Sequence, residues 1–158
     1  FVARDGGIEI FEEASKVADR HARKHGKINI HGMPGKVPHF SAHLTSGGRL
    51  PAKHVIHSVA LDYDPELGLY CNGDIISKST KNVLNLGTQN SLKSIGFPAL
   101  GTGLYDVPLE EAIEAMTGEF EKHLREVTSL ERLGIVLFGK DAFRSGSSYL
   151  RHVKDIPY

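Results

Sequence analysis

The sequence predicts an α/β fold of three layers, in which helices cover both faces of a mixed, mostly parallel central sheet. Two observations predict it. Apolar stretches rich in β-branched residues alternate with longer segments of helical periodicity, as expected when strands and helices follow one another along the chain. The 158 residues are a usual size for one domain, and no repeat or flexible linker interrupts them. We therefore expect a single domain over residues 1–158.

The first half of the chain is expected to contain one helix and two strands. Apolar residues recur at helical spacing between residues 7 and 24, and we expect the helix to end near Gly26. Residues 26–38 are rich in glycine and proline, which predicts a loop with short extended pieces. Residues 39–45 and 54–61 are predicted strands, joined by the turn SGGRLPAK.

The second half alternates helices with strands. Helices are predicted over residues 75–92 and 108–125 and around 147–153, and strands over residues 94–100 and 133–139. Pro108 suits the first turn of its helix, because the N–H that it lacks would have no helical partner there. Ligands of such sheets bind at the carboxyl ends of strands, so the loop that follows the first of these strands is the first place to expect a site.

The composition restricts the class of function. With 40% apolar and 24% charged residues, the chain is typical of globular proteins. Its 19 basic and 19 acidic side chains cancel, which argues against bulk binding of nucleic acid. No apolar run approaches the roughly 20 residues of a membrane-spanning helix. The single Cys71 excludes an internal disulfide and fits a reducing compartment, so we predict a cytoplasmic location.

The stretch Gly101-Thr102-Gly103 lies where a predicted strand ends and a helix begins. Glycine leaves backbone N–H groups uncovered, so such a loop can wrap a phosphate, and the helix N-terminus adds a favourable dipole. Glycine is also common in strand-to-helix turns that bind nothing, so both interpretations stay open. The loop is neither a P-loop nor a dinucleotide fingerprint, because Asp106 stands where the latter needs its third glycine.

Four segments resemble the macro domain, the ADP-ribose-binding α/β/α module. SIGFPALGTGLYDVPLEEA (94–112) is similar to that family's signature segment, in which a strand ending in Phe-Pro runs into a small-residue loop and a helix. HLTSGGRLPAKHVIHSVA (43–60) resembles the segment that precedes it, with a strand ending in Thr, a Gly-Gly-x-Leu-Pro turn and Val-Ile-His. RDGGIE (4–9) resembles the glycine-rich first loop, and VLFGKDAF (136–143) the last strand.

The resemblance implies a ligand and a set of residues that bind it. The loop at 100–105 would wrap the diphosphate with its amides, and Tyr105 would also wall off the distal ribose. The first glycine loop would approach the distal ribose and its phosphate. Phe138 would lie against the adenosine, where stacking on an aromatic ring contributes roughly 1–3 kcal/mol. The implied ligand-binding residues are Gly6, Gly7, Ile8, Leu100, Gly101, Thr102, Gly103, Leu104, Tyr105 and Phe138.

The resemblance also bears on catalysis. Glu9 stands where hydrolytic members carry a catalytic aspartate and non-hydrolytic members often carry alanine. A carboxylate there would hold the water that hydrolyses an ADP-ribosyl ester or O-acetyl-ADP-ribose, although glutamate reaches a different point in space than aspartate. The family's first strands and its Asn-Ala-Ala-Asn stretch are expected to be missing upstream of Phe1.

The resemblance leaves three main functions open, and hydrolysis of other phosphorylated nucleotides is a more distant fourth. The first is binding of ADP-ribose, free or attached to protein or nucleic acid, with hydrolysis through Glu9. The second is a reader that binds the same ligand without turnover, and the third is an interaction domain with a degenerate pocket. No cofactor and no membrane partner are expected.

Other reactive side chains are better explained by structure than by chemistry. His21 and His25 have the spacing of a zinc-binding pair, but the stretch HARKH lacks the intervening glutamate and carries two cations. The acidic stretch LDYDPE (61–66) is expected to be a solvated loop, and His57 a hydrogen-bonded core histidine. No base that could activate Cys71 is apparent. We therefore expect no metal site and no catalytic thiol.

Overall fold

The structure is a computed structural model that describes residues 5–26, 28–30 and 33–154. It contains two compact units, Phe1–Tyr70 and Cys71–Tyr158. The expectation of a single domain stays a prediction. None of the helices in these residue ranges is long and apolar enough to cross a membrane.

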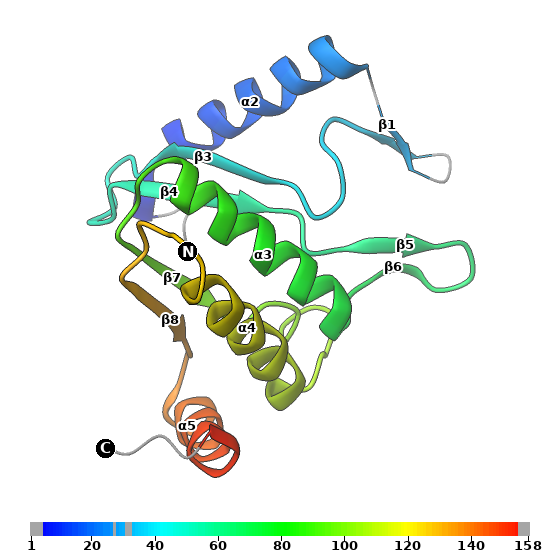
Figure 1. Ribbon diagram of the computed structural model, residues 1–158. Helices are drawn as coiled ribbons and strands as arrows, with labels where there is room; N and C mark the ends of the chain where they lie inside the picture. The colour runs from blue at the N-terminus through cyan, green and yellow to red at the C-terminus, as the bar shows by residue number, and fades with distance from the viewer. Residues whose placement is uncertain (1–4, 27, 31–32, 155–158) are drawn as a thin grey trace. The chain divides into compact units, whose positions relative to one another are not determined.

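The first unit combines one long helix with antiparallel strand pairs (Figure 1). Its elements are α2 (Glu9–His25), β1 (Ile28–Ile30), β2 (Met33–Gly35), β3 (Ala42–Ser46), β4 (His54–Ser58), β5 (Asp62–Asp64) and β6 (Gly68–Tyr70). The pairs are β1–β2, β3–β4 and β5–β6. Each pair joins strands that are consecutive in the chain, as hairpins do.

Helix α2 confirms the predicted amphipathic helix and packs against β3. It ends where Gly26 adopts a φ of 81°, a conformation that glycine enters without steric cost. Glu9 and Glu12 lie in the first turn and three basic residues in the last, which suits the helix dipole. The Glu13 carboxylate accepts a hydrogen bond of 2.6 Å from the Ser46 amide and ties the helix to the end of β3.

The two strands predicted around the SGGRLPAK turn are confirmed as β3 and β4. Their register places His43 opposite His57. The prediction of a loop over the acidic stretch 61–66 is wrong. This stretch contains strand β5 and the start of the turn to β6. Asp64 Oδ1 accepts hydrogen bonds from the amides of Glu66 and Leu67 at 2.8 and 3.0 Å, which closes the turn. Strands of three residues are too short to show a periodicity.

The second unit contains α3 (Gly73–Gln89), β7 (Ser94–Pro98), α4 (Leu109–Leu124), β8 (Arg132–Val136) and α5 (Lys140–Lys154). Strands β7 and β8 pair in parallel, joined by a crossover that contains α4. Among the strands that the structure describes, parallel pairing is confined to this pair. The predicted helices and strands of this half are confirmed, and α5 is longer than the short helix expected around 147–153.

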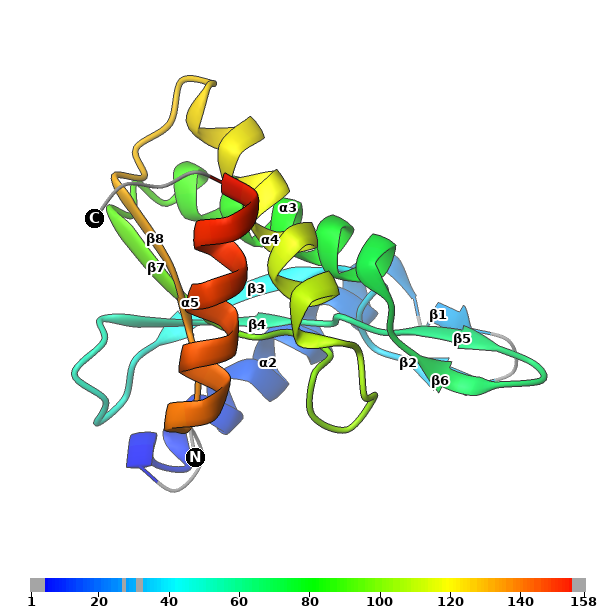
Figure 2. The same cartoon turned by 90° about the horizontal axis from the view of Figure 1, so that it is seen from below.

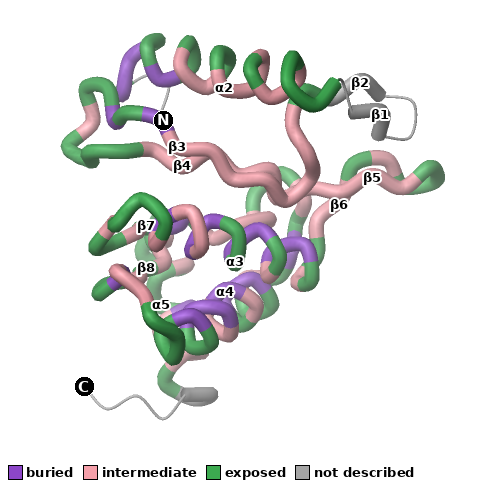
Figure 3. Tube along the Cα trace, turned by 45° about the horizontal axis from the view of Figure 1, so that its top comes forward, coloured by how far each residue is buried: buried purple, intermediate pink, exposed green. Residues whose placement is uncertain are grey.

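The core of the second unit lies between α3, α4 and one face of β7 and β8. Helices α3 and α4 lie side by side (Figures 1 and 2), and their facing surfaces carry most of the buried positions (Figure 3). Phe97 of β7 contacts Phe120 of α4, with ring centroids 5.1 Å apart. Gly87, which interrupts the helical pattern, lies against β7: a Cβ there would stand 2.7 Å from Ile95 Cδ1. Close packing therefore explains a glycine in mid-helix.

Along β7 and β8, exposed residues alternate with more buried ones, so one face of the pair is covered and the other is open. The covered face carries Phe97 and points toward the helices. Pro108 is the N-cap of α4, with φ −52° and ψ 138°, one residue before the expected first-turn position. The loop that connects β7 to α4 begins after Pro98 and ends at the N-terminus of α4.

Candidate functional site

The loop between β7 and α4 is fixed at both ends by its own hydrogen bonds. The Thr102 hydroxyl donates to the Ala99 carbonyl at 2.9 Å, and the Val107 amide donates to the Gly101 carbonyl at 3.2 Å. Val107 is buried, with 6% of its surface exposed. The loop is therefore a tight turn with anchored ends, and the Thr102 amide, not its hydroxyl hydrogen, remains available to a ligand.

The middle of this loop is open. Within the described part of the chain, no group accepts a hydrogen bond from the main-chain nitrogens of residues 101–105. A Cβ at Gly103 would meet no atom within 4 Å, and the Leu104 side chain is 87% exposed. A main-chain N–H group raises the free energy of the folded chain when neither water nor a ligand accepts its hydrogen bond. This turn can therefore present several donors to one anion.

Gly101 has the opposite surroundings. Its φ is 78°, and a Cβ there would stand 2.9 Å from both Cys71 Sγ and Val107 Cγ2. This glycine is required by packing as well as by backbone conformation. Burial raises the pKa of the Cys71 thiol, which favours its protonated form.

Acidic side chains surround the loop. Asp106 is exposed and has a φ of 49°, and Glu110 is exposed in the first turn of α4. The Glu111 carboxylate accepts a hydrogen bond of 2.7 Å from the Gly73 amide, at the start of α3. An anion bound in this loop would therefore be held by main-chain dipoles and not by basic side chains of the loop.

The first glycine loop precedes α2 in the other unit. Gly6 and Gly7 are buried, while Ile8 is 71% exposed and Glu9 is exposed. Gly7 has a φ of 89°. The side chains of Glu9 and Arg49 both come close to the position that a Cβ of Gly7 would occupy. A ligand that reaches Gly7 would therefore meet a carboxylate and a guanidinium.

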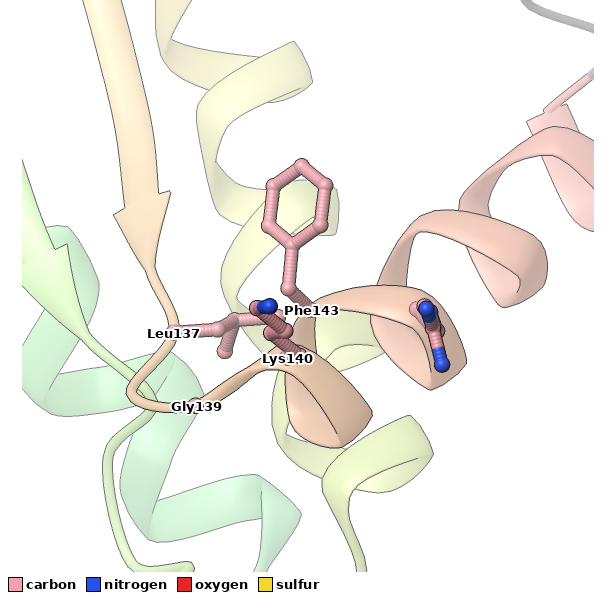
Figure 4. Close-up of a pocket in the computed structure, with 5 residues that line it drawn as sticks. Leu137, Gly139, Lys140 and Phe143 are labelled. Carbon is pink, nitrogen blue, oxygen red and sulfur yellow. The ribbon is translucent and has the colours of Figure 1, made fainter.

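Phe138 follows β8 and is 89% exposed. A shallow cavity of about 490 Å³ opens beside it, at the junction of β8 and α5 (Figure 4). The cavity is lined by Leu137, Gly139, Lys140, Phe143 and Arg144. The sequence pattern alone does not predict this cavity. The spacing of Lys140, Phe143 and Arg144 on one helix face was the available signal, but it became visible only once α5 was known to begin at Lys140.

The histidines have structural surroundings. His57 Nε2 lies 3.0 Å from Thr45 Oγ1, and burial lowers the pKa of His57, partly offset by the Glu13 carboxylate. Burial also lowers the pKa of His43, and the nearby His21 and His57 lower it further. In the described ranges, no group of three or more His, Cys, Asp or Glu side chains is placed to hold a metal ion.

The structure thus gathers the predicted residues into separate groups. Leu100 to Tyr105 form one turn with unpaired amides, Gly6 to Glu9 form the entry to α2, and Phe138 lies next to a cavity that the sequence did not reveal. The ligand-binding role of each group, and the catalytic role of Glu9, stay predictions.

Comparison with known proteins gives the class of the fold. The family model described as Macro domain matches residues 2–116. A Trypanosoma brucei macrodomain in complex with ADP-ribose is similar in structure, with a TM-score of 0.70, 26% identity, and coverage of 93% of this chain and 53% of that one. An Oceanobacillus iheyensis macrodomain with MES bound has a TM-score of 0.76 at 21% identity and covers 98% and 75%. These likenesses confirm the α/β class.

The chain belongs to the Macro domain family. An uncharacterized protein of Pyrobaculum aerophilum is 32% identical over 146 residues, which are 90% of this chain and 69% of that protein. An O-acetyl-ADP-ribose deacetylase of Klebsiella pneumoniae is 35% identical over 107 residues, 68% of this chain and 60% of that protein. The chain therefore spans roughly two thirds of the length of these relatives.

Proposed function

We propose that this macro domain binds ADP-ribose, free or attached to protein or nucleic acid, and that the amides of residues 101–105 hold its diphosphate. The observation that carries the proposal is the turn around Gly103, where several main-chain N–H groups are unpaired and the space above the glycine is empty. The similar Trypanosoma brucei macrodomain is in complex with ADP-ribose, and the similar Klebsiella pneumoniae protein is named an O-acetyl-ADP-ribose deacetylase. The N-terminus of α4 adds a dipole of the right sign.

The other contacts follow the family resemblance. Gly6, Gly7 and Ile8 would contact the distal ribose and its phosphate, and Tyr105 would pack against the same sugar. Phe138, which is largely exposed, offers a face on which adenine can stack. A cytoplasmic location remains a prediction from the composition.

We further propose hydrolysis of an ADP-ribosyl ester such as O-acetyl-ADP-ribose, with Glu9 as the carboxylate that holds the water. The water oxygen bonds to the acyl carbon, and the bond between that carbon and the ribose oxygen breaks. The proton that Glu9 takes from the water passes to the leaving ribose oxygen, and the acid is released. The observation in favour is an exposed carboxylate beside Gly7.

Two measurements on the full chain test these proposals. Calorimetric titration with ADP-ribose should give saturable 1:1 binding, whereas a degenerate pocket would give no heat beyond dilution. Release of acetate from O-acetyl-ADP-ribose should exceed the buffer rate and fall in Glu9→Gln. Binding without turnover would establish the reader and exclude the hydrolase.

A further inference from the structure

The loop at 101–105 rests on the segment that begins α3. A Cβ at Gly101 would stand 2.9 Å from Cys71 Sγ and 3.1 Å from Ile76 Cδ1, so the two segments are in close contact. Ile76 is completely buried in the first turn of α3, and the core of the second unit therefore fixes its position. The start of α3 thus supports the beginning of the loop.

The end of the loop runs into α4, whose first turn is tied to the same segment. The N-cap residue of α4 is Pro108, whose side chain has no acceptor for a capping hydrogen bond. Glu111, in the first turn of α4, makes a different contact. Its Oε1 accepts a hydrogen bond of 2.7 Å from the amide of Gly73, the first residue of α3. Glu111 therefore connects the start of α4 to the segment on which Gly101 lies.

The contact has two physical reasons to persist although Glu111 is exposed. The first amides of a helix have no partner within the helix, and the Glu111 carboxylate satisfies that of Gly73, while Asn72 Oδ1 accepts from the Ile75 amide at 3.0 Å. A negative charge at a helix N-terminus is also favoured by the helix dipole. The side chain of Glu111 thus acts as a cap of α3 that is supplied by α4.

We propose that Glu111 is a positioning residue that holds the loop at 101–105 in the shape that binds the diphosphate. This inference rests on the proposed function. The Val107 amide donates to the Gly101 carbonyl at 3.2 Å and closes the loop, and the contact of Glu111 fixes the closed loop to α3 at its second end. Without this contact the first turn of α4 can shift relative to α3, and the loop amides lose the single arrangement that one anion requires.

The test compares two substitutions that remove the same charge. Glu111→Ala also removes the hydrogen bond and should weaken ADP-ribose binding about 5- to 10-fold. Glu111→Gln keeps an oxygen that can accept from the Gly73 amide, and it should bind ADP-ribose as tightly as wild type or more tightly. An effect of charge alone would strengthen binding in both variants, because the ligand is an anion. Calorimetric titration of the full chain measures the affinities.

The thiol of Cys71 gives a second readout. It is the single cysteine of the chain and lies against Gly101, so its rate of alkylation by iodoacetamide reports on the contact between the loop and α3. Burial and the Glu111 charge both raise the pKa of this thiol, so the two variants, which both lack the charge, are compared with each other. The rate should be at least about 3-fold higher in Glu111→Ala than in Glu111→Gln.

Glu114→Ala is the matched control. Glu114 lies three residues further along α4, and its carboxylate accepts a hydrogen bond of 3.1 Å from the Tyr149 hydroxyl of α5. This variant should keep the wild-type affinity and alkylation rate, and melting temperatures of all variants exclude unfolding. Equal affinities or equal alkylation rates in Glu111→Ala and Glu111→Gln overturn the positioning role and leave ADP-ribose binding standing. Wild type that does not bind ADP-ribose overturns both proposals.

Discussion

The two glycine loops of this macro domain use glycine in different ways. At Gly7 the space of the missing side chain is filled by the chain's own Glu9 and Arg49, and at Gly103 the same space is empty. The loop at 101–105 also contains both cases, because Gly101 is enclosed by Cys71 and Val107. The space beside Gly103 therefore has room for a further group, whereas the chain itself occupies the space beside Gly7 and Gly101.

The largest effect is expected at the open glycine. Gly103→Val should weaken ADP-ribose binding at least about 100-fold, which corresponds to about 2.7 kcal/mol, because the new side chain would occupy the space of the diphosphate. The melting temperature should stay close to that of wild type, since no atom lies within 4 Å of the new Cβ. Calorimetric titration and thermal denaturation measure the two quantities.

A matched control for this variant lies on β8. Gly134→Val also adds a side chain where no atom lies within 4 Å, but outside the loop. It should leave the ADP-ribose affinity unchanged. Equal losses of affinity in both variants would contradict the special role of the loop.

A substitution at the enclosed Gly101 should lower the stability of the fold. Gly101→Ala should destabilise the fold by about 2 kcal/mol, because it adds the strain of a φ of 78° to two contacts of 2.9 Å. Gly26→Ala provides the comparison, since Gly26 has a similar φ of 81° and nothing within 4 Å, and should cost only about 1 kcal/mol. Urea denaturation measures both, and equal costs would show that packing at Gly101 contributes nothing.

A smaller effect is expected from the acidic residue of the loop. Asp106→Asn should strengthen ADP-ribose binding by about 3-fold at low salt, because it removes a negative charge near the proposed diphosphate and asparagine tolerates the observed φ of 49°. The gain should shrink as ionic strength rises. Titrations at two salt concentrations check this, and a gain independent of salt would argue against an electrostatic cause.

The smallest predicted effect is a loss of stability at low pH. We expect it in the first unit, which contains the first glycine loop. The pKa values of His43 and His57 are lowered in the folded chain, mainly by burial, so protons bind more readily to the unfolded chain. The free energy of unfolding should be highest above the ordinary histidine pKa of about 6.5. It should decrease as the pH falls from there through the lowered pKa values of the folded chain. Hydrogen exchange at pH 7.5 and pH 5.5 should show the loss of protection in β3 and β4.

The His43→Gln/His57→Gln double variant tests the cause of this acid sensitivity. Glutamine is polar and does not titrate, so the variant should lose less protection between the two pH values than wild type does. The same loss in both proteins would place the sensitivity elsewhere.

The sequence by itself determined the α/β class, the order of the main helices and strands, and the position of the loop after β7. These features follow from periodicity, glycine placement and motif spacing, which act over a few neighbouring residues. The hairpin of β5 and β6 was not predicted, because its strands are only three residues long. The start of α5 at Lys140 was not predicted either, nor was the cavity beside Phe138.

Only the tertiary structure determined whether the space beside each glycine is filled or open. Gly101 and Gly103 are two residues apart and look alike in the sequence, yet one lies against Cys71 and the other faces empty space. Gly7 likewise meets Arg49, 42 positions further along the chain, because the turn after β3 docks on the Gly6 carbonyl. Local conformational preference is a property of adjacent residues, whereas the space beside a glycine is set by distant segments that the fold brings to it.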